Sequence, residues 1–385
     1  MSLNNQLPML RNSERAAFKR CQAQWNWAWN YGPDGIGLTP IFEPQGARWF
    51  GSMLHIALAE WYTPPMKDGK RASGFVRGKD PRETWEELCK EAYANIRTTE
   101  YAEDTEQEWA TAKELGAVML AGYLAEYGID EAWEVLMPEQ RFDAKIPFNN
   151  RQKKMLESSD NRMNLSTRLR FNSSGGFITR LVGTFDMPIR DHSVAGEPIK
   201  IVDHKSTGKK ESIAHLTKDD QIGTYISTAT GFLRKAKLIE ASEAVTGVIF
   251  NYLRKSKPKD DRPQNEKGQF LNKDGSVSKN QGVPLFWREE IPRNKANRIR
   301  QVVRIADDAE AIGAVRSGAL PVLKNPGEHC AWCDFKELCD VDEDGGDVEQ
   351  FIHDAFKIQD MYADHRQGAI NSKESVESKK ESGVR

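Results

Sequence analysis

The sequence predicts an α/β fold in which a central mixed sheet is flanked by helices and preceded by a helical N-terminal portion. Three observations favour this class. Apolar residues recur at helical spacing as far as residue 127. After Met137 polar and apolar residues alternate, as is typical of strands. A helical segment then separates two groups of strands, and a basic helix closes the series. We expect one domain with a helical subdomain.

The N-terminal portion contains four predicted helices. Ser13 is a suitable N-cap for the first helix, and Gly32-Pro33 ends it. Pro64-Pro65 ends the second helix in the same way. The predicted ranges are 12–31, 49–62, 81–96 and 106–127.

The remaining elements follow in the order strand group, helix, strands and helix. The predicted strands cover 140–147, 165–171, 177–190, 198–204, 245–253 and 284–291, with a hairpin turn at 191–197. Helices are predicted at 218–238 and 294–317. Residues 256–283 are polar and rich in Gly, Asn and Lys, which predicts a loop or a small hairpin insertion. Beyond Asp340 we expect an acidic stretch, a helix around 348–362 and a disordered charged end.

These elements divide the chain into four segments. Residues 1–136 form the helical N-terminal portion, and residues 137–320 form the sheet core. Residues 321–345 are a cysteine-bearing segment, and residues 346–385 are a partly disordered tail.

Composition restricts the cellular setting. Of the 385 residues 38% are hydrophobic and 29% charged, which is typical of a globular protein in water. No apolar run approaches the roughly 20 residues that span a bilayer, so we expect no membrane partner. Residues 1–20 lack the apolar core of a signal peptide, and an odd count of five cysteines argues against a disulfide framework. We therefore expect a cytoplasmic protein, or one of the host cytoplasm if it is encoded by a phage.

Two aspartates and a lysine form the strongest candidate for a catalytic site. Asp203 and Lys205 are two residues apart at the end of a strand, so both point to the same face, whereas His204 points to the other. A hairpin can bring Asp186 of the preceding strand beside them. Carboxylates can hold Mg²⁺ or Mn²⁺, and such a metal acidifies water and neutralises phosphate charge. A surface ion pair is the alternative interpretation of Asp203 and Lys205.

The order of several short motifs resembles the RecB-family nucleases of the PD-(D/E)XK superfamily. The motifs are Gly51-x-x-x-His55, Gly183-x-x-Asp186, Asp203-His204-Lys205-Ser206-Thr207-Gly208 and Gln221-x-x-x-Tyr225. The resemblance implies a restriction-endonuclease-like mixed sheet. It also implies a metal held by His55, Asp186, Asp203 and the backbone carbonyl of His204, with Lys205 as the catalytic lysine. Gln221 and Tyr225 would line the active site or the DNA path.

Three cysteines lie within ten residues of each other, as Cys330-x-x-Cys333-x₅-Cys339. Three nearby thiolates indicate a metal, and Cys21 and Cys89 compete for the fourth ligand position. A structural zinc is one interpretation, since zinc prefers four Cys or His ligands. The arrangement also resembles the Fe–S members of the RecB family, namely AddB-type and CRISPR-associated exonucleases.

The resemblance to these exonucleases implies a [4Fe–4S] cluster on Cys21, Cys330, Cys333 and Cys339 that acts as a C-terminal Fe–S clasp. Gln22 departs from those relatives, many of which have proline after the first cysteine. We expect Cys89 to be an ordinary buried residue.

Basic clusters supply candidate contacts to DNA phosphates, although the net charge of −2 shows no overall basic excess. The leading candidates are Lys209, Arg254, Lys255 and Arg298. We expect a metal-dependent DNA exonuclease that acts on single-stranded or end-frayed DNA in recombination, repair or phage DNA processing. A DNA endonuclease and a non-catalytic Fe–S DNA-binding subunit are the alternatives.

The chain has no P-loop. We therefore expect that the chain is not itself a helicase, and a helicase or a strand-annealing protein is a candidate partner. The length resembles stand-alone phage-type or CRISPR-associated relatives.

Overall fold

The computed structural model describes residues 7–366 except 42–45, 68–69, 72–74, 97–101, 139, 158–175, 211–212, 258–262, 264, 267–268 and 280–283. The predicted strand at 165–171 and the charged end beyond residue 366 lie outside the described residues. None of the described helices is both long and apolar enough to cross a bilayer.

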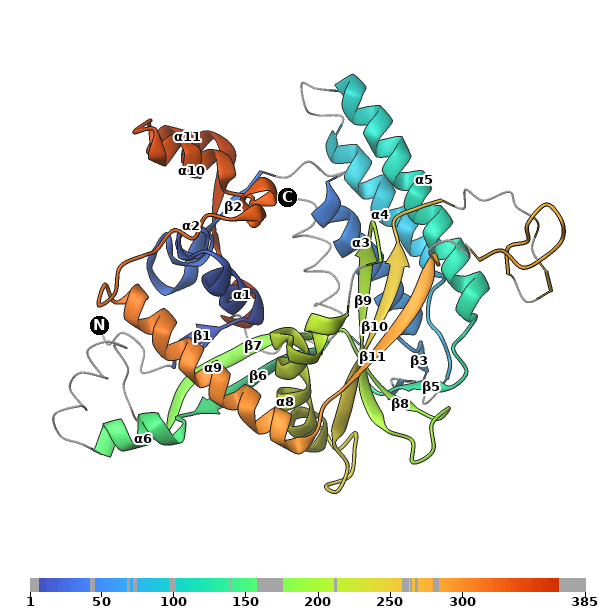
Figure 1. Ribbon diagram of the computed structural model, residues 1–385, viewed down its shortest axis with the longest axis horizontal. Coiled ribbons are helices and arrows are strands. Elements are labelled where there is room, and N and C mark those ends of the chain that lie inside the picture. The colour runs from blue at the N-terminus through green and yellow to red at the C-terminus, as the bar shows by residue number, and fades with distance from the viewer. Residues whose placement is uncertain are drawn as a thin grey trace.

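A five-stranded mixed sheet forms the centre of the molecule (Figure 1). Its order is β11 (Phe286–Pro292), β10 (Val245–Arg254), β9 (Ile199–Thr207), β8 (Met187–Asp191) and β5 (Trp133–Val135). β9 and β10 run parallel, whereas the other neighbours are antiparallel. The prediction of a mixed sheet is confirmed.

A second sheet of three strands lies beside the first one. Its order is β1 (Met9–Leu10), β7 (Phe177–Phe185) and β6 (Gln140–Pro147). The sequence predicts one continuous strand over 177–190, and this prediction is wrong. β7 ends at Phe185, and the chain then passes at Asp186 into β8 of the other sheet. Asp186 therefore lies where the two sheets separate.

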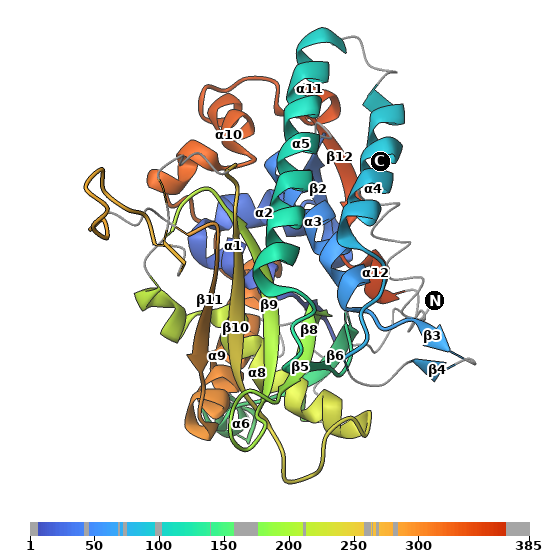
Figure 2. The same ribbon diagram turned by 90° about the vertical axis from the view of Figure 1, so that its right-hand side faces the viewer.

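Helices cover both faces of the central sheet (Figures 1 and 2). On one side lie α3 (Ala47–Tyr62), α4 (Pro81–Ile96) and α5 (Ala102–Tyr127). On the other side lie α8 (Asp220–Lys235) and α9 (Lys295–Arg316). Successive side chains of β9 point to opposite faces of the sheet, so Ile201 packs toward α8 and Val202 packs toward α3. The five helices confirm the predicted helices at 49–62, 81–96, 106–127, 218–238 and 294–317.

Side-chain caps fix where α8 and α9 begin. The Asp219 carboxylate accepts a hydrogen bond from the backbone N–H of Ile222 at the start of α8. Asn294 and Asn297 form a reciprocal capping box at the start of α9. Both caps satisfy N–H groups that have no partner inside the helix.

The first predicted helix, 12–31, is in fact two helices. α1 (Asn12–Arg20) and α2 (Gln22–Asn30) are separated by Cys21, whose extended backbone has φ −157° and ψ 120°. Helical periodicity continues across this break, which is why the sequence pattern does not reveal it. The break turns the chain at the cysteine itself.

The C-terminal segment returns to the N-terminal helices. The predicted helix at 348–362 ends early, because α11 (Val348–Ala355) is followed by β12 (Phe356–Asp360), which pairs with β2 (Ile36–Pro40). Gly37 of β2 lies against the carbonyl of Ala28 so closely that a Cβ would collide with it. Tyr362 is buried and donates a hydrogen bond from its hydroxyl to Glu14 of α1. The two ends of the described chain therefore pack against each other.

The remaining elements are short. They are η1 (Pro33–Gly35), β3 (Met66–Lys67), β4 (Lys70–Arg71), α6 (Asn150–Glu157), η2 (Ala214–Lys218), η3 (Glu328–Trp332), α10 (Lys336–Glu343) and α12 (Ala363–Arg366). Within the predicted insertion at 256–283 the described part includes one antiparallel bridge between Leu271 and Val277.

Candidate active site

Strand register brings the two aspartates together. Met187 of β8 pairs with Val202 of β9 in an antiparallel ladder. The preceding residue Asp186 and the following residue Asp203 are therefore the next facing positions. The described pairing of β9 with β8 stops at Val202, whereas its pairing with β10 continues to Thr207. The aspartates thus meet where the sheets separate.

Helix α3 adds His55 to this pair. Its Nδ1 lies 3.3 Å from Oδ2 of Asp186. One turn earlier, Gly51 faces Ser206 of β9, and a Cβ added there would lie 3.5 Å from the Ser206 hydroxyl oxygen. This is an ordinary van der Waals distance, so α3 packs directly on β9 one turn before His55.

Lys205 lies on the same face of β9 as Asp203 and points toward α8. Its Nζ is 2.7 Å from Oδ2 of Asp203 and 3.4 Å from Oε1 of Gln221. The Gln221 amide in turn donates to the Tyr225 hydroxyl at 2.9 Å. The residues expected to be catalytic or to line the site are therefore contiguous in space.

Burial and mutual repulsion dominate the electrostatics of the aspartates. Burial, together with the neighbouring Asp186 carboxylate, raises the pKa of Asp203 to about 7 even though Lys205 opposes the shift. Burial lowers the pKa of His55, but the Asp186 carboxylate more than reverses this, so the pKa lies above its usual value. Two acids are held together at a position where ionising both is costly.

The donor set suits a hard divalent cation. Two carboxylates lie beside each other and an imidazole contacts one of them, and besides burial it is the like charge of Asp186, which a cation would neutralise, that raises the Asp203 pKa. Among the residues that the structure describes, no three His, Cys, Asp or Glu side chains are grouped as a formed metal-binding cluster. Instead, Asp186 contacts His55 on one side and Asp203 on the other.

His204 points away from the aspartates, as its place in the strand predicts. Its ring stacks on Tyr62 at 5.7 Å and an interplanar angle of 21°. Its Nδ1 lies 2.9 Å from the side-chain nitrogen of Asn251 on β10. Burial and the nearby His55 lower the pKa of His204 to about 3, so the ring is neutral. Asn251 is not among the residues predicted from the sequence, although an amide inside the apolar strand Val-Ile-Phe-Asn-Tyr-Leu is a signal that the sequence contains.

The four candidate phosphate contacts divide between two ends of the sheet. Arg254 is the last residue of β10 and Lys255 follows it, and the Lys255 N–H donates to the carbonyl of Thr207. Lys209 is exposed close by. Arg298 instead donates to the carbonyl of Val245 at the start of β10, roughly 30 Å from Arg254 along the strand. The structure brings three candidates together and leaves Arg298 apart.

The C-terminal cysteine segment lies against Cys21. The Asn325 side chain donates to the carbonyl of Arg20, and the Leu323 N–H donates to Oε1 of Gln22. Gln22, the departure from the relatives, thus joins the two segments.

The thiols lie near one another in this region. Burial raises the pKa of Cys333, and the nearby thiols of Cys21 and Cys330 raise it further. Burial also raises the pKa of Cys339. The nearby Lys324 ammonium opposes this shift, and the Cys21 thiol adds to it. Within the described chain the four cysteines do not constitute a formed metal-binding group either.

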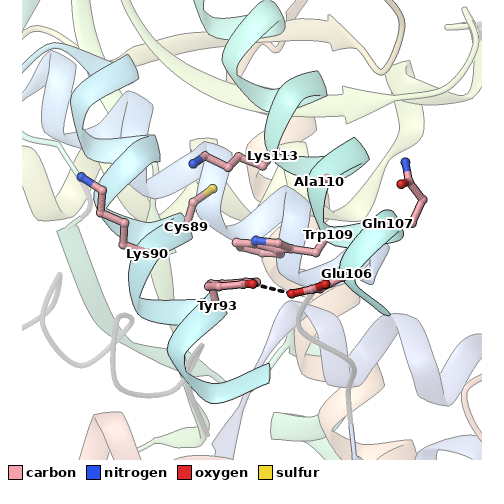
Figure 3. A pocket seen from close by; sticks show the side chains of 8 residues that line it. All are labelled: Cys89, Lys90, Tyr93, Glu106, Gln107, Trp109, Ala110 and Lys113. Carbon is pink, nitrogen blue, oxygen red and sulfur yellow. Dashed lines mark hydrogen bonds between the residues drawn. The ribbon is translucent and has the colours of Figure 1, made fainter. Parts of the chain in front are cut away.

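Cys89 lies elsewhere, on α4. Figure 3 shows it in a pocket between α4 and α5, with Tyr93, Trp109 and Lys113 among its neighbours. Burial raises its pKa to about 12. The structure therefore gives it the buried position that the sequence predicts.

The family profile described as the PD-(D/E)XK nuclease superfamily matches residues 13–340, which is most of the chain. This protein belongs to the PD-(D/E)XK nuclease superfamily. The comparison with curated proteins finds no match.

The raised pKa of Asp203 predicts how stability depends on pH. Between pH 4 and 7, approximately, the folded metal-free protein binds a proton that the unfolded chain releases, so stability falls as pH rises through this range. Asp203→Asn cannot ionise, so we expect its Tm to exceed that of the wild type at pH 8 by roughly a few degrees. The gain should shrink toward pH 4. The measurement is thermal unfolding in EDTA at pH 4, 6 and 8.

The exposed Asp354, whose pKa is lowered mainly by the Gln350 amide, supplies the matched control. The Tm of Asp354→Asn should not exceed that of the wild type at pH 8. A change in Tm for Asp203→Asn that is equal at all three pH values would contradict the raised pKa of Asp203.

Proposed function

We propose that this protein is a metal-dependent DNA nuclease whose site is built on Asp186, Asp203 and Lys205. The observation that carries the proposal is the placement of the buried Asp203 carboxylate and the half-buried Asp186 carboxylate at facing positions of the β8–β9 register, beside a lysine. Together with His55 and the backbone carbonyl of His204, the carboxylates would hold Mg²⁺ or Mn²⁺. When bound, the metal supplies Lewis acidity toward water and phosphate.

The protein groups around the carboxylates have separate roles. Lys205 can orient the attacking water or balance the charge that develops on the phosphate. Gln221, held by Tyr225, contacts the Lys205 ammonium and restricts where it points. An ion pair alone would not require this second layer of polar contacts.

We further propose that DNA leaves the site along the carboxyl ends of β9 and β10. Lys209, Arg254 and Lys255 lie at these ends, and the Lys255 ammonium is 5.3 Å from the Phe50 ring. A cavity of about 430 Å³, lined by Phe50, Leu115 and Lys255 among others, lies at this edge. It offers an apolar wall and a cation, which suits a single strand better than a duplex. Arg298 would at most contact DNA at the far end of the sheet.

An exonuclease acting on single-stranded or end-frayed DNA fits this arrangement best. Helices α1 and α2 lie on one side of the strand ends, and α3 to α5 lie on the other (Figure 1). A site flanked on both sides favours a threaded strand over an intact duplex. An endonuclease of the same fold is the alternative. Recombination, repair and phage DNA processing are the proposed settings, with a helicase or strand-annealing protein as partner.

We also propose a [4Fe–4S] cluster on Cys21, Cys330, Cys333 and Cys339. The proposal is supported by the break at Cys21 and by the hydrogen bonds that hold residues 323–325 against residues 20–22. Thiolates suit such a cluster. Hydrolysis requires no electron transfer, so the role of the cluster would be structural. It would close the long loop of chain between residues 21 and 330.

Removing either charged group on β9 should abolish cleavage. We expect Asp203→Ala and Lys205→Ala to lose activity by at least about a thousandfold, because each removes a group that contacts the reacting centre. The measurement is degradation of end-labelled DNA at saturating Mg²⁺ or Mn²⁺. Lys235→Ala, an exposed lysine on α8, is the control and should retain full activity. Wild-type rates from Asp203→Ala would refute the active-site assignment.

The cysteines should differ in their effect on iron content. After anaerobic purification we expect about four iron atoms per chain and a brown colour. Cys21→Ser should lose the iron, whereas Cys89→Ser should keep it because Cys89 is buried on α4. Metal analysis that finds zinc and no iron would favour the structural zinc instead.

The need for a free end separates the exonuclease from the endonuclease. We expect rapid degradation of linear single-stranded DNA and survival of a covalently closed circle of similar sequence. Degradation should weaken as salt rises, since the contacts are to phosphates. Equal loss of both substrates would establish the endonuclease alternative.

A further inference from the structure

A row of three polar side chains, two buried and one half-buried, crosses the central sheet on the face opposite Asp203 and Lys205. The strand registers place His204 of β9 beside Asn251 of β10, and Asn251 beside Arg288 of β11. Asn251 is fully buried, and His204 is 4% exposed. A polar row in such a position is costly unless every member finds a partner.

Donor and acceptor chemistry fixes the direction of the hydrogen bonds. Arg288 can only donate, and its Nε lies 3.3 Å from Oδ1 of Asn251. The Asn251 amide nitrogen must then face the other way, where it lies 2.9 Å from Nδ1 of His204 and 2.7 Å from the Tyr123 hydroxyl. Nδ1 of His204 is therefore the acceptor, and the ring proton is on Nε2.

The row ends on a carboxylate that holds it in place. The Tyr123 and Tyr62 hydroxyls are 2.7 Å apart, and Tyr62 donates to Asp130. Asp130 also binds Arg288 through N···O distances of 2.7 and 2.9 Å. Because a carboxylate only accepts and a guanidinium only donates, no member of the circuit can reverse its direction.

Aromatic rings around this circuit restrict the movement of the Arg288 and His204 side chains. The Arg288 guanidinium lies 3.6 Å from the ring centre of Tyr127 and 3.8 Å from that of Trp133. Tyr62 stacks on the face of the His204 ring. The side chain of His204 is thus held on a ring face and at Nδ1, while the adjacent residues carry the proposed catalytic groups.

We propose that Asn251 is a positioning residue of this nuclease, which holds His204 from behind β9 and so fixes Asp203 and Lys205 on the opposite face. The inference rests on the proposed function and extends it to a residue that contacts neither metal nor DNA. Within a strand, rotation about residue 204 moves both neighbours, so a loose His204 would misplace both groups. Misplacement by about 1 Å is enough to reduce turnover strongly.

The test compares Asn251→Leu with Gln152→Leu. Both substitutions replace a fully buried amide, but Gln152 lies on α6 and bonds to the carbonyl of Ala306 on α9, away from the site. We expect Asn251→Leu to lower kcat at least tenfold on linear single-stranded DNA with Mn²⁺, with KM within about twofold of the wild type. Gln152→Leu should keep kcat at a temperature where both variants are folded. Equal kcat values for the two variants would overturn the proposal.

A second measurement does not depend on activity. In the metal-free protein labelled with ¹⁵N-histidine, long-range NMR correlations should show His204 with its proton on Nε2. Asn251→Asp places an acceptor against Nδ1 and should move a proton there. A wild-type His204 protonated on Nδ1 would overturn the proposal, whatever the activity. Wild-type protein that cleaves no DNA but shows the Nε2 proton would instead refute the proposed nuclease function and leave the hydrogen-bond circuit supported.

Discussion

The antiparallel pairing of β8 with β9 holds two carboxylates beside each other at the point where the chain enters the central sheet. Asp186 is the residue at which β7 gives way to β8, and Asp203 is its facing position on β9. The pairing of Met187 with Val202 keeps the two backbone positions next to each other. The raised pKa of Asp203, the approach of His55 and the contact with Lys205 all follow from this constraint. Ionising both acids is unfavourable in this arrangement, and a bound cation would offset that cost, as at many functional sites.

The N- and C-terminal segments form a second unit whose packing does not depend on the cysteines alone. β12 pairs with β2, and Phe335 stacks on Phe356 at a centroid distance of 5.2 Å. Glu14 is fully buried, yet it accepts from Arg316 and Trp25 as well as from Tyr362. A cluster at Cys21 would therefore add to a closure that hydrogen bonds and aromatic packing already provide.

Local patterns in the sequence predicted most of the site and less of the topology. The period of two placed Asp203 and Lys205 on one face and His204 on the other, and the structure confirms this. The alternation over 177–190 could not show that β7 and β8 belong to different sheets. Alternation indicates which residues share a face of a strand, but not which other strand it pairs with. Helical spacing likewise continued through Cys21, although its backbone is extended. The partners of Asn251 come from α5, β9 and β11, so only the tertiary structure could reveal the circuit. The iron cluster and the exonuclease activity remain predictions.

The most direct test of the account is the position of a bound metal. Crystals grown with Mn²⁺ and without substrate would give anomalous scattering that locates the ion independently of any enzymatic assay. We predict one peak between Asp186 and Asp203, at about 2.0–2.3 Å from an oxygen of each, with His55 on its third side. Mn²⁺ bound elsewhere in well-ordered density, with the two carboxylates still in contact with each other and with Lys205, would contradict it.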